Sequence, residues 1–190
     1  AEALAAIDNY RLDLPKRMRD AIATAQAPLP DDPVFKGHDA RLIGSARLSL
    51  EAAAQRASAL GIPAMILSDA IEGEAADIAR MHAAIAREIA LRDRPFRKPV
   101  LLLSGGETTV TLKGNGRGGR NTEFLLALAI ALDGMAGVYG FAADTDGIDG
   151  SESNAGAFIG PDTLVRLQKL GLQPRASLAN NDAFSAFEAL

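Results

Sequence analysis

The sequence has no cysteine among its 190 residues and only two histidines, to which we assign no metal. Without cysteine the chain has no disulfide scaffold, no thiolate metal site and no cysteine nucleophile. Basic residues are outnumbered, because 20 Lys and Arg face 24 Asp and Glu, for a net charge of −4. The positive surplus expected of a nucleic acid-binding protein is therefore missing. No run approaches the roughly 20 apolar residues of a membrane span, so we expect no membrane partner. The absence of cysteine suits a reducing compartment, so we expect a cytoplasmic protein.

What the sequence does contain is the composition of a globular protein, with 48% hydrophobic and 23% charged residues. The length suits one large domain or two small ones. The chain begins without methionine and stops inside a helical pattern at Leu190. We therefore expect part of a longer protein.

Short apolar segments alternate with longer helical patterns along the chain. Strands are expected at residues 41–45, 63–67, 100–103, 108–112 and 138–141, and helices at 47–60, 73–92, 121–132 and 161–170. Such alternation predicts an α/β protein with a parallel sheet. The charged, proline-bounded segment Arg92–Pro99 is the best candidate for a domain boundary.

The segment Lys113–Glu123 carries the strongest chemical signal, with four glycines and two arginines ahead of a predicted helix. Backbone N–H groups in such a loop, next to the positive end of a helix dipole, can surround an anion. Arg117 and Arg120 add guanidinium groups that suit bidentate contacts with a phosphate or carboxylate. The segment therefore predicts a phosphate site, and the alternative is a mobile turn with two solvated arginines.

The same loop also matches the dinucleotide pattern G-x-G-x-x-G, through Gly114, Gly116 and Gly119. Asp144 ends the next predicted strand, as that pattern requires. We rank this interpretation second, because the two arginines would crowd a pyrophosphate and the preceding strand is polar.

Two further segments combine glycine with acidic side chains. The loop Asp144–Gly150 offers Asp146 and Asp149, which could hold Mg²⁺ partly through water or bind substrate hydroxyls. A pair of Asp-Gly turns is an equally weighted alternative. Ser104–Glu107 is expected to be a turn between two strands, and Glu107 could pair with an arginine, orient a substrate or act as a base.

Three segments taken together resemble the MOFRL-type glycerate kinases, a family whose members are also named hydroxypyruvate reductases or tartrate-degradation proteins. They are Leu103–Val110, Gly116–Glu123 and Asp144–Gly150, in this order along the chain. Arg41–Leu48 and Asn181–Leu190 are similar to flanking blocks of the family, so the similarity covers nearly the whole chain.

The resemblance implies a layered α/β/α architecture. The tail of a Rossmann-like nucleotide-binding domain is expected at residues 1–97, followed by a MOFRL domain at residues 98–190 that is truncated at its C-terminus. The sequence departs from the family pattern at Thr122, where Gln is usual, at Ala46, where Asn is common, and at Asp144, where Gly commonly precedes Thr-Asp-Gly.

The resemblance also implies a reaction, the transfer of phosphate from ATP to D-glycerate with Mg²⁺ as cofactor. The expected partners are a small hydroxy acid and a nucleotide, and the protein could form a homodimer. Arg120, Arg117 and Glu107 are the expected catalytic residues, with Arg120 clamping the phosphate or carboxylate and Glu107 orienting Arg120 or the substrate. The expected substrate and phosphate contacts, of which the last two are also the expected metal ligands, are Ser104, Gly105, Gly106, Gly116, Gly118, Gly119, Asn121, Asp146 and Asp149.

Two other functions remain as alternatives. A hydroxypyruvate reductase would hold NADH or NADPH on the loop at Gly114. A non-catalytic domain would bind a substrate or effector without turning it over.

Overall fold

The computed structural model describes residues 2–26, 28–39 and 41–190, and its contacts divide the chain into two units, Ala1–Ile43 and Gly44–Leu190. The smaller unit contains α1 (Glu2–Asn9), α2 (Lys16–Thr24) and the 3-10 helix η1 (Pro33–Phe35). An ion pair of 2.6 Å between Arg19 and Asp8 links α2 to the end of α1. In the described residues no helix is both long and apolar enough to cross a bilayer.

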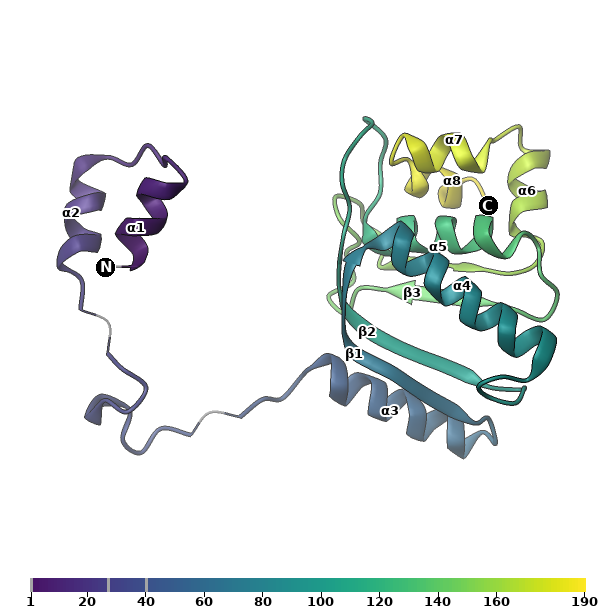
Figure 1. The fold of residues 1–190 in the computed structure, drawn as a ribbon, viewed down its shortest axis with the longest axis horizontal. Coiled ribbons are helices and arrows are strands. Elements are labelled where there is room, and N and C mark those ends of the chain that lie inside the picture. Colours follow the sequence, from purple (N-terminus) through teal and green to yellow (C-terminus); the bar gives the residue numbers. More distant parts are fainter. Residues whose placement is uncertain (1, 27, 40) are drawn as a thin grey trace. The chain divides into compact units, whose positions relative to one another are not determined.

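The larger unit is a mixed α/β fold, which confirms the predicted class (Figure 1). Its elements in chain order are α3 (Ala46–Ala59), β1 (Ala64–Glu74), α4 (Ala75–Arg92), β2 (Leu101–Thr109), α5 (Arg120–Leu132), β3 (Gly140–Ala143), β4 (Gly156–Ile159), α6 (Thr163–Lys169), α7 (Pro174–Ala179) and α8 (Ala183–Glu188).

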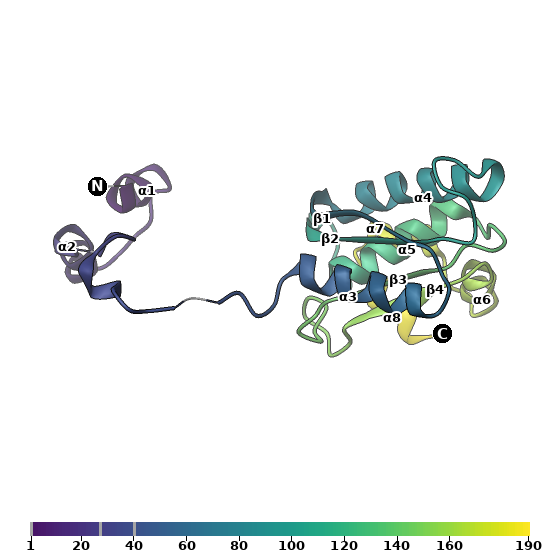
Figure 2. The ribbon, with the colours of Figure 1, turned by 90° about the horizontal axis from the view of Figure 1, so that it is seen from below.

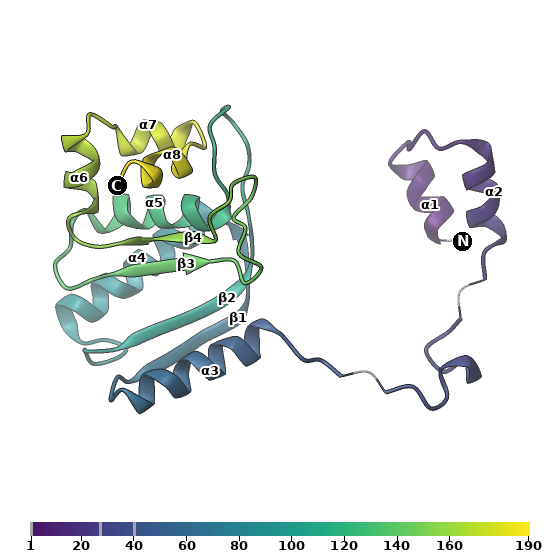
Figure 3. The same cartoon turned by 180° about the vertical axis from the view of Figure 1, so that it is seen from behind.

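Two small sheets lie within this unit. β1 and β2 are parallel, with Ala64 opposite Leu101, and β3 and β4 are antiparallel, with Gly140 opposite Ile159. Figure 2 shows α3 on one face of the β1–β2 pair and α4 on the other, while α5 runs beside α4 and covers β3 and β4 (Figure 3). Helices therefore cover both faces of the parallel pair. Two strands are too few to identify the predicted Rossmann-like tail, which stays a prediction.

Helix α5 forms the centre of the core because other elements pack around it. Leu125 and Leu126 are fully buried, the first against α4 and the second towards α6 and α8. Ala79 and Ala83 of α4 are also buried in this core, and their small side chains let the two helices approach closely. The N-terminus of α5 is thereby held in one place, which matters for the site described below.

Strand β2 differs from the prediction of two strands joined by a turn at Ser104–Glu107. It is one continuous strand, so the predicted turn is wrong. Gly105 lies inside the strand, where a Cβ would contact Leu50 of α3 at 3.4 Å. The glycines suggested a turn, but here they let a helix and a neighbouring strand approach the backbone.

Other elements were mispredicted at the edges of the unit. The segment at residues 41–45 is not a strand, and Leu42 and Ile43 are exposed rather than buried. A short strand forms only where a neighbour supplies hydrogen bonds. Strand β4 and helix α7 were not predicted, because each is too short to show a clear periodicity.

The predicted domain boundary at Arg92–Pro99 lies between α4 and β2. β1 before it pairs directly with β2 after it, so residues 44–190 form one unit in space. The assignment of residues 1–97 and 98–190 to two protein domains stays a prediction.

The close approach of β1 and β2 at Gly106 gives a first testable prediction. The residue has φ of +150°, and an added Cβ would overlap the backbone of Ile71. Gly106→Ala is therefore expected to lower the free energy of unfolding by about 3 kcal/mol, measured by denaturant titration. Gly44→Ala is the control, because a Cβ there meets no atom within 4 Å. Equal stability of the two variants would contradict the close approach.

Candidate functional site

A cavity of about 430 Å³ opens at the N-terminal end of α5. Besides α5 itself, four segments form its walls: the chain just after β2, the glycine loop (residues 113–119), the acidic loop (residues 144–155) and the segment that leads into α8. Arg120, Glu123, Asp144 and Asp146 are its charged lining residues. All three motif segments thus meet at one cavity, the first of them through Val110. Glu107 of the same segment contacts the lining residue Arg120.

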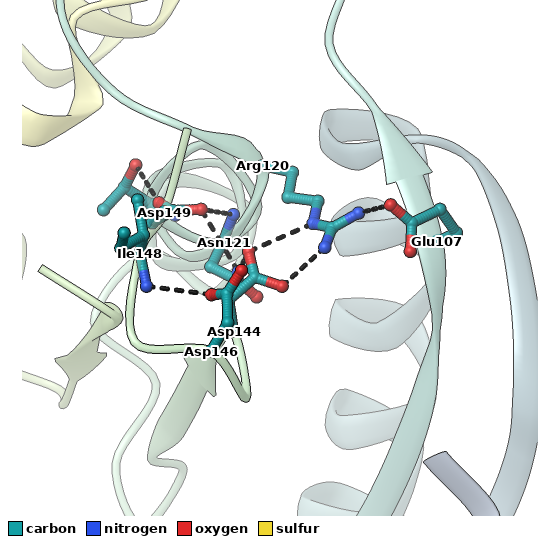
Figure 4. Close-up of polar contacts among 8 residues, drawn as sticks. Glu107, Arg120, Asn121, Asp144, Asp146, Ile148 and Asp149 are labelled. Atoms are coloured by element: carbon teal, nitrogen blue, oxygen red, sulfur yellow. Dashed lines mark hydrogen bonds and ion pairs between the residues drawn. The ribbon is translucent and has the colours of Figure 1, made fainter. Parts of the chain in front are cut away.

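Arg120 is the central side chain of this site. As the first residue of α5, it points between the ends of β2 and β3 (Figure 4). Its Nη2 donates to Oδ1 of Asp144 at 2.5 Å and its Nε donates to Oδ2 at 3.2 Å, while Nη1 forms an ion pair with Glu107. The hydrogen bond to Asp144 raises the pKa of the guanidinium above its ordinary value. Arg120 is therefore charged and held in a fixed orientation by two carboxylates.

Asp144, noted above as a departure from the family pattern, has a defined role here. Besides Arg120 it accepts a hydrogen bond of 2.9 Å from Nδ2 of Asn121. The same Nδ2 lies 3.1 Å from Oδ1 of Asp149. Asn121 thus joins two carboxylates of the acidic loop to the start of α5, and its predicted contact with substrate stays a prediction.

Asp149 caps helix α5. Its side chain is fully buried, and its oxygens accept from the backbone N–H of Asn121 at 2.9 Å and of Thr122 at 2.8 Å. The Thr122 hydroxyl donates a further bond of 2.8 Å. A carboxylate at this place satisfies N–H groups that have no partner within the helix and complements its dipole. Because both oxygens are engaged, the geometry favours capping over the predicted contact with metal or substrate.

The glycine loop is held by the segment before α8. Oδ1 of Asn181 accepts from the amides of Lys113 at 2.7 Å and Gly114 at 3.0 Å, and the carbonyl of Asn180 accepts from Gly116 at 3.0 Å. A Cβ at either of these glycines would overlap Asn180. The glycines are thus required by packing within the protein.

This packing leaves few backbone N–H groups free for the predicted anion site. Three of the four amides in Gly116–Gly119 donate to acceptors in the protein, and only that of Gly118 has none in the described part of the chain. The amide of Arg120 likewise has no acceptor among the described residues. Gly118 and Arg120 both line the cavity, so their amides and the Arg120 guanidinium are the groups best placed for an anion.

Arg117 lies outside the cavity lining. Its Nη2 donates to Oε2 of Glu152 at 2.5 Å, its Nη1 lies 3.6 Å from Glu188, and its guanidinium carbon is 4.5 Å from the centre of the Phe184 ring. Arg117 therefore ties the glycine loop to the acidic loop and α8. These contacts favour a structural role, and the catalytic role predicted for it remains untested.

Ser104, Gly105 and Gly106 also lie away from the cavity. The hydroxyl of Ser104 is 3.0 Å from Nε2 of His82, and the two glycines pack against α3 and β1. Nothing in these contacts favours the predicted binding of substrate by the three residues.

Asp146 is an exposed carboxylate of the cavity lining, whereas Asp144 is half-buried and Glu123 is buried. Oδ1 of Asp146 accepts from the amide of Ile148 at 3.0 Å (Figure 4). No group of three or more acidic or histidine side chains that could hold a metal was found among the described residues. A single carboxylate still suits Mg²⁺ that is bound mainly through phosphate oxygens. Of the two predicted metal ligands, Asp146 is the one whose position permits that contact.

Two polar residues of the cavity lining, Glu123 and Asn181, were missed by sequence reasoning. Glu123 is 8% exposed, and its Oε2 accepts from Nδ2 of Asn181 at 3.0 Å. Burial raises the pKa of this carboxyl above the ordinary value. The signal for Glu123 was available, because it lies in the first turn of a predicted helix, three residues after Arg120, and residues three apart on a helix share a face. The position of Asn181, 58 residues further along the chain, gave no such signal.

Comparisons with known proteins agree with the motif resemblance. Residues 100–190 match the MOFRL family. The chain is 45% identical over 186 residues to a "Putative hydroxypyruvate reductase" of Agrobacterium vitis and 35% identical over 188 residues to a D-glycerate 2-kinase of Thermotoga maritima. A crystal structure of glycerate kinase from Thermotoga maritima has a TM-score of 0.83 and 34% identity. The predicted similarity to MOFRL-type glycerate kinases is confirmed.

The chain spans less than half the length of these proteins. It aligns over 97% and 98% of its own residues, but covers 48% of the Agrobacterium protein and 44% of the Thermotoga kinase. The alignment with the crystal structure covers 98% of this chain and 44% of the Thermotoga chain.

The capping role of Asp149 gives the second prediction. Asp149→Ala leaves N–H and hydroxyl donors buried without an acceptor, so the free energy of unfolding should fall by about 3 kcal/mol. Asp146→Ala removes a carboxylate from the same loop at an exposed position, and it should cost less than about 1 kcal/mol. Denaturant titration of both variants measures the difference. A loss for Asp149→Ala no larger than that for Asp146→Ala would contradict the capping role.

Proposed function

From the match of residues 100–190 to the MOFRL family, we propose that the protein serves in the ATP-dependent phosphorylation of D-glycerate. The observation that carries the proposal is the position of Arg120, which lies on the cavity wall between Glu107 and Asp144. The named kinase relative and the glycerate kinase structure support the same reaction.

The cavity suits the small hydroxy acid. Its volume of about 430 Å³ is at the lower end of ligand pockets, which favours a small acid over a whole nucleotide. The unused amides of Gly118 and Arg120 and the Arg120 guanidinium can bind the carboxylate of glycerate or the phosphoryl group being transferred. Apolar side chains such as Leu112 and Ile148 complete the wall.

The chemistry asks for positioning more than for a strong nucleophile. A guanidinium that is already oriented needs no reorganisation when charge develops on the phosphoryl oxygens. Asp144 and Glu107 provide that orientation for Arg120, and Glu107 thereby acts as a positioning residue.

The charge balance supports Mg²⁺ as cofactor. The cavity lining carries one arginine against Glu123, Asp144 and Asp146, so a polyphosphate would enter an acidic site unless a cation accompanied it. When bound, Mg²⁺ would neutralise charge on the phosphate oxygens. Asp146 would contact it through the oxygen that does not accept from Ile148.

The reductase alternative has less support from the geometry. The similarity to a protein named hydroxypyruvate reductase keeps it open. A dinucleotide would need the backbone at Gly114 and Gly116 to approach its pyrophosphate. In this structure those glycines pack against Asn180 instead, and their amides are already used.

We further propose that residues 1–97 are the end of a Rossmann-like nucleotide-binding domain and residues 98–190 are most of the MOFRL domain. The match of the MOFRL family from residue 100 supports this division. The homodimer and a link to tartrate degradation are retained as predictions of the family resemblance, and the cytoplasmic location is retained as a prediction from composition.

A paired assay tests the kinase function. The complete native polypeptide that contains this sequence should release ADP from ATP when D-glycerate and Mg²⁺ are present, and should not oxidise NADH or NADPH with hydroxypyruvate. Coupled ADP release and NAD(P)H absorbance measure the two reactions, with the Thermotoga D-glycerate 2-kinase as positive control. NAD(P)H oxidation without ADP release would overturn the proposal in favour of the reductase. Binding without either reaction would favour the non-catalytic domain.

Arg120 gives a prediction for the same assay. Arg120→Ala should lower kcat/KM by about 10²-fold or more, and Arg120→Lys should recover little, because an ammonium group lacks the planar fork. Arg80→Ala, on the exposed surface of α4, is the matched control and should be neutral. Activity of Arg120→Ala within a few-fold of the parent would remove Arg120 from the mechanism. A loss of similar size for Arg117→Ala would restore its predicted catalytic role.

A further inference from the structure

Glu123 is a buried carboxyl that lines the cavity and that the proposed function does not yet use. It is 8% exposed, and its hydrogen bond to Asn181 occupies Oε2. Oε1 has no hydrogen-bond partner among the described residues, yet it is not among their fully buried, unsatisfied side-chain atoms. One oxygen is therefore fixed by the protein and the other is left for the cavity.

The position of Glu123 relative to Arg120 suits it to a reaction between an anion and a hydroxyl. The two residues are three apart on α5 and line the same cavity. An acid bound by the guanidinium and the unused amides would carry its hydroxyl groups into the space lined by Glu123. Asp144 is less available for this purpose, since both of its oxygens bind Arg120.

The surroundings of Glu123 raise the pKa of its carboxyl above the ordinary value. Burial is the main cause that raises its pKa, and the nearby carboxylate of Glu74 raises it further. The hydrogen bond from Asn181 and the charge of Lys113 oppose this rise. A carboxylate with a raised pKa accepts a proton more readily than an ordinary glutamate at the surface.

We propose that Glu123 is the general base that receives the proton of the substrate hydroxyl. The inference rests on the proposed kinase function. In the step, the O–H bond of the hydroxyl breaks and its proton moves to Oε1 of Glu123, while the hydroxyl oxygen forms a bond to the γ-phosphorus of ATP. The bond from that phosphorus to the bridging oxygen breaks, and ADP leaves. Asn181 is a positioning residue in this step, because it holds the other carboxylate oxygen.

The experiment separates the base from a structural role. Glu123→Gln keeps an oxygen that can accept from Asn181 but removes the carboxylate. In the complete native polypeptide, kcat should fall by about 10²-fold or more while the thermal midpoint changes little. Glu88→Gln on α4, away from the cavity, is the matched control with the parent's kcat.

A pH profile adds a readout that packing alone would not change. In the parent, kcat/KM should rise with pH as Glu123 loses its proton, at a pKa above that of an ordinary glutamate, and this rise should be absent from the residual activity of Glu123→Gln. Glu123→Asp, which keeps a carboxylate on a shorter side chain, should retain the rise with reduced kcat.

The possible outcomes are distinct. Glu123→Gln with the parent's kcat and pH profile would overturn the role of Glu123 and leave the kinase function standing. A loss of kcat that follows loss of thermal stability in both Glu123→Gln and Glu123→Asp would show a structural role and would also overturn the proposal. A parent without glycerate-dependent ADP release would overturn the kinase function and this step with it.

Discussion

The carboxylate of Asp149 against the first turn of α5 is the contact on which the rest of the site depends. Its two oxygens bind the amides of Asn121 and Thr122, so the acidic loop is attached to the helix at a fixed distance. This attachment also sets where Asp144 lies and therefore how Arg120 is oriented. Gly119 must be glycine for the same reason, since a Cβ there would overlap Asp149. A buried cap thus organises the charged residues that face the cavity.

Because α5 is already capped by Asp149, the glycine-rich loop before it offers fewer groups for binding an anion than its sequence suggests. A loop of this composition before a helix usually suggests that backbone amides and the helix dipole bind an anion. Here the carboxylate of Asp149 already lies at the positive end of the helix dipole. Most backbone N–H groups of the glycine loop already donate to Asn180–Asp182. The remaining anion site is small and depends on the Arg120 side chain. Such a site recognises a single carboxylate or phosphoryl group better than a pyrophosphate, which agrees with a hydroxy acid as its ligand.

The sequence predicted helices α3, α4, α5 and α6 and the mixed α/β class. It also predicted that Arg120, Glu107 and the acidic loop would come together, because three motifs in order indicated one family. The prediction was wrong at Gly105 and Gly106, which suggested a turn. These glycines lie inside β2 and permit close packing against α3 and β1. Glycine spacing alone does not distinguish a turn from a close approach of backbones, since both need the absence of a Cβ.

Contacts between distant parts of the chain explain the remaining differences at the site. Arg117 and Arg120 were both predicted to be catalytic. Arg117 instead forms ion pairs with Glu152 and Glu188, which lie outside the glycine loop. Asn181 begins a segment that the sequence indicated only as a flanking block of the family, yet its side chain joins the glycine loop to Glu123. Asn181 also has φ of +53°, a backbone conformation that Asn tolerates better than most residues. The position therefore suits Asn for its backbone as well as for its side chain. Replacing Asn181 would therefore disturb both the glycine loop and the buried carboxyl of Glu123. The shape of the cavity and the environment of Glu123 thus depend on the same side chain.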